Sequence, residues 1–188
     1  MKKTITLLLA TIITLTVSGQ SFGLKGGMAL TNLSGDITYD ARTGIYLGAF
    51  LKMGENNIQW SPEIIFHQKG AANFSITGEN GVIANYHLNY TEMSINAHFH
   101  INDELALTAG PYAGYAAAAT NKSFDENIQY NPIDFGINLG ASYAINDLFN
   151  IDLRYGMGLI EILEEVTKNQ NNMQNTSLQV GIGYIFSY

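Results

Sequence analysis

Two histidines, His98 and His100, are the side chains in this sequence best spaced to bind a metal ion. They lie two residues apart in a segment of alternating polarity, so both imidazoles share one face of a strand. Two imidazoles in that arrangement could ligate zinc, but zinc sites use three or four protein ligands and no third ligand is visible in the sequence. We therefore interpret the pair as polar filling or interfacial side chains near a turn, and we predict no metal site and no cofactor.

Four charged residues of mixed sign occupy the polar positions of alternating segments: Glu92, Asp134, Asp152 and Arg154. Two carboxylates and a cation could form an acid–base pair with an electrostatic clamp. The alternative is a structural network, because buried charges persist only with partners and such networks also cluster charges. We favour the second interpretation and predict a lumen charge network made by these four residues inside a closed barrel.

Nucleophilic catalysis has little support in the sequence. Membrane barrels that hydrolyse lipids pair a serine nucleophile with a histidine base. The chain has many serines and four histidines, at positions 67, 87, 98 and 100, but no nucleophile motif. Cysteine is absent, which excludes thiol nucleophiles and disulfides. We predict that the protein is not an enzyme and has no catalytic residues.

Apolar and polar residues alternate with a period of two along most of the chain, and the strands that this pattern predicts would position all of these residues. Towards the C-terminus Leu178, Val180 and Ile182 alternate with Gln179, Gly181 and other small or polar residues, which indicates a strand with one apolar face. Similar patterns predict eight strands, at about 22–30, 44–53, 58–67, 92–100, 104–115, 134–145, 149–159 and 177–188. The facing of the second of these is left open by the pattern, because bulky residues occupy both parities.

The connections between these strands alternate in length. Short polar connections with turn composition lie at 54–57, 102–103 and 146–147. Longer ones lie at about 34–43, 70–85, 119–130 and 161–175. Short turns at one end and long loops at the other are typical of outer-membrane barrels, whose turns are periplasmic and whose loops are extracellular. The predicted fold class is therefore all-β, an eight-stranded antiparallel up-and-down transmembrane β-barrel.

Composition separates a membrane barrel from a soluble one. Charged residues make up 13% of the chain, about half the usual share. A soluble barrel such as a lipocalin would turn its apolar face inward and carry many charges outside. Here the second face is mainly Gly, Ser, Asn and Thr, which suits the crowded interior of an eight-stranded barrel. The apolar face would then contact lipid, and the net charge of −7 gives no basis for binding nucleic acid.

The N-terminal segment has the pattern of a secretory signal peptide. Lys2 and Lys3 precede a mostly apolar stretch from Ile5 to Val17, and Ser18-Gly19 supplies small residues for cleavage. The stretch is shorter than the roughly 20 residues that a spanning helix needs. We predict a signal peptide over residues 1–19 and a barrel domain over residues 20–188.

Several strand motifs resemble those of the PorT-like, or porin-family, outer-membrane β-barrel proteins. The motifs are Phe22–Leu33, Pro62–Gly70, Tyr90–Ser94, Ala109–Tyr115, Asp134–Gly140 and Asp152–Gly156. Tyr90–Ser94 is similar to the family's Tyr-Leu-Glu-Ile-Pro, from which Thr91 and Ser94 depart. The resemblance covers nearly all of the mature chain and implies an eight-stranded outer-membrane barrel. It implies no single activity, although an accessory role in protein secretion is one possibility.

The predicted function is that of a small, non-enzymatic outer-membrane barrel of a Gram-negative envelope. Its role would be structural, or an interaction with a surface through its extracellular loops. The alternatives are a narrow porin-like channel and an accessory component of protein secretion. The expected partners are outer-membrane lipid and an unidentified envelope or surface partner. The aromatic C-terminal strand, which ends in Tyr188, resembles the signal read by the barrel-assembly machinery during biogenesis.

Overall fold

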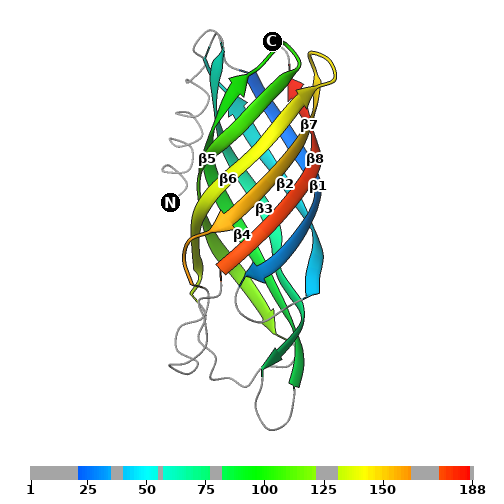
Figure 1. The fold of residues 1–188 in the computed structure, drawn as a ribbon, viewed down its shortest axis with the longest axis vertical. Coiled ribbons are helices and arrows are strands. Elements are labelled where there is room, and N and C mark those ends of the chain that lie inside the picture. The colour runs from blue at the N-terminus through cyan, green and yellow to red at the C-terminus, as the bar shows by residue number, and fades with distance from the viewer. Residues whose placement is uncertain are drawn as a thin grey trace, which may run out of the picture.

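Eight antiparallel strands form a closed barrel. The computed structural model describes residues 21–34, 40–54, 57–76, 82–121, 131–161 and 174–186. The strands are β1 (Ser21–Ser34), β2 (Asp40–Lys52), β3 (Ile58–Ile76), β4 (Val82–His100), β5 (Leu105–Asn121), β6 (Ile133–Ala144), β7 (Phe149–Gly158) and β8 (Gln174–Phe186). Each strand pairs with the next, and β1 pairs with β8 to close the barrel (Figure 1). This confirms the predicted fold class, whereas the predicted signal peptide, residues 1–19, lies outside the described residues.

Burial alternates along the strands as the sequence pattern predicts. In β7 every second side chain, beginning at Asn150, is buried, and the residues between them are exposed. The structure also settles the facing of β2. Tyr46 and Phe50 point inward with 5% and 4% of their surface exposed, whereas Ile45 and Leu47 point outward at 60% and 65%. The bulky aromatics of β2 therefore belong to the interior, and its aliphatic residues belong to the outer wall.

Two asparagines close the tight turns at one end of the barrel. Asn102 Oδ1 accepts hydrogen bonds from the backbone N–H groups of Glu104 and Leu105, at 3.0 and 2.6 Å. Asn146 Oδ1 accepts from Leu148 and Phe149 in the same way, at 2.9 and 2.8 Å. Such side-chain-to-backbone bonds are the reason that asparagine is favoured in turns. We call this end the turn end and the opposite end the loop end.

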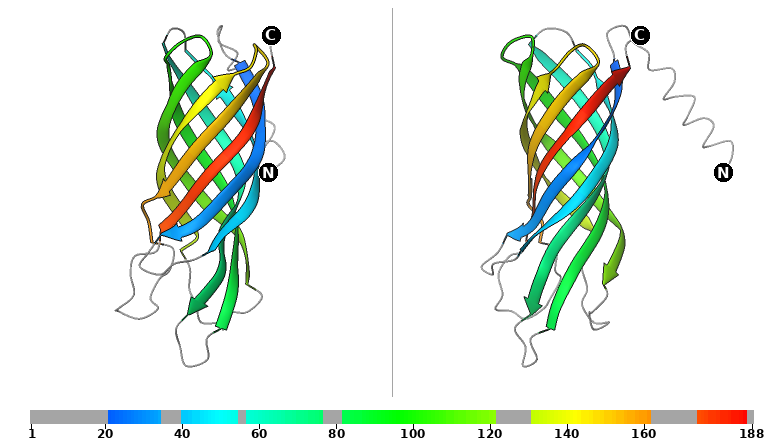
Figure 2. Two further views of the ribbon diagram at one scale, coloured as in Figure 1. Left: turned by 45° about the vertical axis from the view of Figure 1, so that its right-hand side comes forward. Right: turned by 90° about the vertical axis from the view of Figure 1, so that its right-hand side faces the viewer.

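Strands β3, β4 and β5 extend further at the loop end than the sequence pattern indicates. The predicted loop at about 70–85 is wrong over most of its length, because β3 continues to Ile76 and β4 begins at Val82. β5 extends to Asn121, past the end at residue 115 that the alternation indicates and within about three residues of the predicted loop boundary. Figure 2 shows these strands projecting beyond the rest of the barrel. The alternation weakens in these segments, so the pattern alone could not identify them as strands.

The outer wall carries a continuous apolar band. Its members are large side chains that are 36–65% exposed, among them Leu24, Ile64, Phe66, Ile137, Leu153 and Ile182. An apolar surface of this extent would aggregate in water but is matched by hydrocarbon. The closed barrel meets the requirement that backbone polar groups in lipid be paired internally. Among the described residues no helix is long and apolar enough to cross a membrane.

Candidate functional site in the barrel lumen

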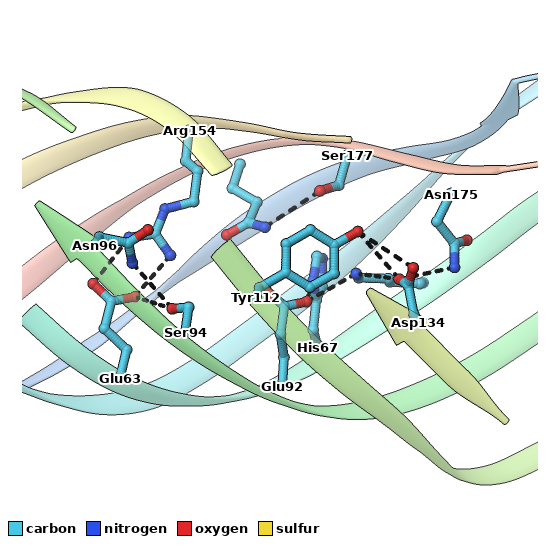
Figure 3. Close-up of polar contacts among 12 residues, drawn as sticks. Glu63, His67, Glu92, Ser94, Asn96, Tyr112, Asp134, Arg154, Asn175 and Ser177 are labelled. Atoms are coloured by element: carbon cyan, nitrogen blue, oxygen red, sulfur yellow. Dashed lines mark hydrogen bonds and ion pairs between the residues drawn. The ribbon is translucent and has the colours of Figure 1, made fainter. Parts of the chain in front are cut away.

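The interior of the barrel holds two groups of buried ionised side chains. We call them the Glu63 cluster (Lys25, Glu63, Arg154) and the Lys69 cluster (His67, Lys69, Glu92, Tyr112, Asp134, Asn175). Figure 3 shows Glu63 and Arg154 on one side of the view, Asp134 and Asn175 on the other, and Tyr112 between them. Glu63 is closer than Lys69 to the start of β3, so the Glu63 cluster lies nearer the turn end.

The Glu63 cluster places one carboxylate between two cations. Arg154 donates two hydrogen bonds to Glu63, from Nη1 to Oε2 at 2.7 Å and from Nη2 to Oε1 at 3.0 Å. Lys25 Nζ lies 2.7 Å from Glu63 Oε1, the oxygen that also accepts from Arg154 Nη2. All three residues are at most 6% exposed. A two-pronged arginine–carboxylate contact fixes both side chains, so β1, β3 and β7 are linked across the lumen.

The Lys69 cluster has the opposite arrangement, with one cation between two carboxylates. Lys69 Nζ lies 2.8 Å from Glu92 Oε2 and 2.9 Å from Asp134 Oδ2. Asn175 Nδ2 donates a further hydrogen bond to Asp134 Oδ2 at 3.0 Å. His67 Nδ1 lies 3.7 Å from Glu92 Oε2. The cluster therefore joins β3, β4, β6 and β8.

Tyr112 helps to enclose Lys69 from β5. Its hydroxyl lies within hydrogen-bonding distance of Asp134, at 3.3 and 3.4 Å, and Lys69 Nζ lies 4.5 Å from the centre of its ring. The ring can approach β6 only because position 136 is glycine. A Cβ there would lie 2.6 Å from a ring carbon of Tyr112 and 2.0 Å from the carbonyl oxygen of Met157. A cation over an aromatic face gains electrostatic attraction in addition to its ion pairs.

The four residues of the predicted lumen network are all buried in the interior, but they do not form one group. Lys69 brings Glu92 and Asp134 together. Arg154 pairs instead with Glu63. Asp152 accepts a hydrogen bond from Asn150 at 2.8 Å, and no ion pair among the described side chains includes it. The predicted set is therefore not joined into one network by direct ion pairs.

Sequence reasoning missed three of the six charged residues that form these ion pairs: Lys25, Glu63 and Lys69. Their parity could have revealed them. Glu63, His67 and Lys69 lie on one parity of β3, and all are buried. Lys69 was hidden because the predicted strand ended at residue 67. The missing cations could also have been inferred from charge balance, since one arginine cannot neutralise three buried carboxylates.

The two closely spaced histidines lie at the turn end. His98 is buried, and the partly buried His100 lies with its Nε2 3.1 Å from Gln59 Oε1. Among the described residues no group of three or more acidic or histidine side chains could hold a metal ion. The described interior thus offers ion pairing and packing of polar side chains.

Comparisons with known proteins agree with the geometry. The structure resembles Neisserial surface protein A, with a TM-score of 0.61 and 16% identity, covering 90% of this chain and 100% of that one. It also resembles OprG from Pseudomonas aeruginosa, with a TM-score of 0.54 and 14% identity over 90% and 97% of the chains. The attachment invasion locus protein Ail of Yersinia pestis gives a TM-score of 0.52 and 16% identity over 90% and 100%. At these identities the likeness concerns the fold alone.

A comparison with curated protein sequences gives no match. The profile of one protein family, described as outer membrane protein beta-barrel domain, matches residues 18–164. That match covers well over half of the sequence and includes seven of the eight strands. The chain therefore belongs to the outer membrane protein beta-barrel domain family and is a small eight-stranded barrel of the outer membrane.

Proposed function

We propose that this protein is a sealed, non-enzymatic barrel that contacts a partner or surface outside the membrane through its loop end. One observation carries the proposal. Strands β3, β4 and β5 continue beyond the other strands as a paired sheet (Figure 2). The pairing of β3 with β2 ends at Ala72, whereas β3 continues, paired with β4, to Ile76.

The projecting sheet offers backbone groups for recognition. Among the described residues, β3 beyond Ala72 and β5 beyond Ala116 pair only with β4. Their outer edges therefore present N–H and C=O groups to which another chain can add a strand. Proteins named for the cell surface and for attachment share this fold, and the proposal extends that kind of role to this chain.

A narrow channel is the second candidate, and the lumen argues against it. Ion-paired side chains from β1, β3 and β7 in one cluster, and from β3, β4 and β6 in the other, bridge the interior. An eight-stranded barrel leaves little free lumen even before such bridging.

We also propose that the chain belongs to the PorT-like subtype, which the order of the strand motifs supports, and that residues 1–19 are removed on export. An accessory role in secretion would use the same projecting sheet.

Site-specific photo-crosslinking in intact cells tests the proposal. A photoreactive residue at Ser75 or Ala84, within the projecting sheet, should give a reproducible adduct with one envelope or extracellular component. The same residue at Ile137, in the apolar band of β6, is the matched control and should give adducts with lipid only. Adducts at Ser75 and Ala84 that do not differ from those at Ile137 would contradict the proposed role. An adduct with a secretion component would select the accessory alternative.

A further inference from the structure

The outer wall has a groove where β2, β3 and β4 lie side by side, at the loop end of the apolar band. Its volume is about 260 Å³. Ile45, Leu47 and Phe66 line it, and each is at least 60% exposed, so the groove opens on the lipid-facing side. Two polar side chains, Gln68 and Asn89, border it towards the loop end, and Thr91 lies level with Phe66.

An irregularity in the β2–β3 ladder accompanies this groove. The pairing shifts register between Ala41 and Tyr46. Gly44 lies so close to β3 that a Cβ would be 2.4 Å from the carbonyl oxygen of Gln68. The Ile45 N–H donates to Gln68 Oε1 at 3.4 Å, so a side chain replaces a backbone partner there. Gln68 shares the outward parity of Phe66 on β3, so an amide side chain lies on the outer wall directly beside apolar residues.

We propose that this groove binds an ester-linked acyl chain of an outer-membrane lipid, with the ester region of the lipid at Gln68 and Asn89. The groove is continuous with the lipid-facing surface, so a lipid is the molecule that reaches it. Leu47 and Phe66 lie in the row nearer the middle of the band, and Gln68 and Asn89 lie in the row nearer the loop end, beside Ile45. The amides are therefore on the side where a lipid of the loop-side leaflet has its ester region. Side-chain amides can donate to ester carbonyls. The volume is below the roughly 300–1,000 Å³ of sites for compact ligands, so the groove holds part of one acyl chain and no more.

Native mass spectrometry of the purified barrel tests this site. The barrel in dodecyl maltoside micelles is titrated with dioleoyl phosphatidylethanolamine, and a saturable adduct of one lipid per barrel is expected. Leu47→Trp fills the groove, and Phe66→Ala removes one of its walls. Each should weaken the adduct by about tenfold, which corresponds to 1.4 kcal/mol of binding free energy.

Leu153→Trp is the matched control, because Leu153 faces lipid on β7 and is 50% exposed. It should leave the adduct unchanged, and heat-modifiable gel mobility should show that all three variants are folded. Equal adducts in all variants, or an unsaturable series of adducts, would overturn the site. If the wild-type barrel forms a dimer that Leu47→Trp abolishes while lipid binding is unchanged, the groove binds a second copy of the chain, and the proposal is overturned.

Discussion

The Glu63 cluster and the Lys69 cluster both keep charged side chains paired inside the barrel, but their central residues have opposite charges. Near the turn end a carboxylate lies between two cations, and nearer the loop end an ammonium group lies between two carboxylates. Each cluster has a central residue that contacts both of its ionised partners. Formal charge is therefore unbalanced within each cluster and balanced over the two together, with three cations and three carboxylates.

Because of this arrangement, we expect substitution of a central residue to lower the free energy of unfolding more than substitution of an outer one. Removing an outer member leaves one cation and one carboxylate, which remain paired with each other. Removing a central residue leaves two like charges in a buried space without the charge that compensates them. Breaking a buried ion pair in this way costs about 3–5 kcal/mol. The two clusters should also respond differently to pH, because carboxylates can be neutralised by acid and cations cannot.

The largest effect is expected for Lys69→Met. The substitution leaves Glu92 and Asp134 facing each other without a cation, and it should lower the free energy of unfolding by at least about 3–5 kcal/mol at neutral pH. Urea titration of the barrel in lipid vesicles, followed by heat-modifiable gel mobility, measures the loss. At roughly pH 4 the defect should shrink, since protonated carboxyl groups no longer repel each other.

The matched variant in the other cluster is Glu63→Gln. It should also destabilise the barrel, but acid should not restore it, because Lys25 and Arg154 stay charged. Equal recovery of both variants in acid would show that the clusters are not organised around opposite central charges.

A smaller effect is expected for Arg154→Met. Glu63 keeps Lys25 at 2.7 Å, so the carboxylate stays paired after the arginine is lost. Hydrogen bonds to charged groups contribute about 1.5–3 kcal/mol, and the loss should lie in that range, below that of Glu63→Gln. The same urea titration provides the comparison. An Arg154→Met variant less stable than Glu63→Gln would reverse the proposed order of central and outer residues.

The smallest effect is expected for Asp152→Asn. Asp152 belongs to neither cluster and accepts one hydrogen bond, from Asn150. An asparagine oxygen can accept the same bond, so the free energy of unfolding should change by about 1 kcal/mol or less. If Asp152→Asn lowers the free energy of unfolding as much as Lys69→Met, the four residues predicted from the sequence act as one network, and the division into two clusters is wrong.

The sequence predicted the barrel well because the determining signal is local. Alternation along β7 or β8 needs only neighbouring residues, and the turns at Asn102 and Asn146 are set by side chains within three positions. The facing of β2 was not predictable, because Ile45 and Tyr46 are both bulky and only the other strands decide which of them enters the lumen.

The partners inside the lumen could not be predicted for a related reason. Glu63 and Arg154 are 91 positions apart, and Lys69 and Asp134 are 65 apart. Their pairing depends on the stagger of strands around the barrel, which alternation does not specify. Strand parity therefore identifies which residues point inward, and register decides which of them meet.

Single-channel recording of the wild-type barrel in a planar lipid bilayer tests the sealed lumen most directly. Two clusters that bridge the interior should leave no continuous path for ions, so we expect no stepwise conductance from folded protein. A low conductance that appears only in Lys69→Met or Glu63→Gln would fit the same account. Reproducible openings of the wild-type protein, unchanged in those two variants, would contradict it.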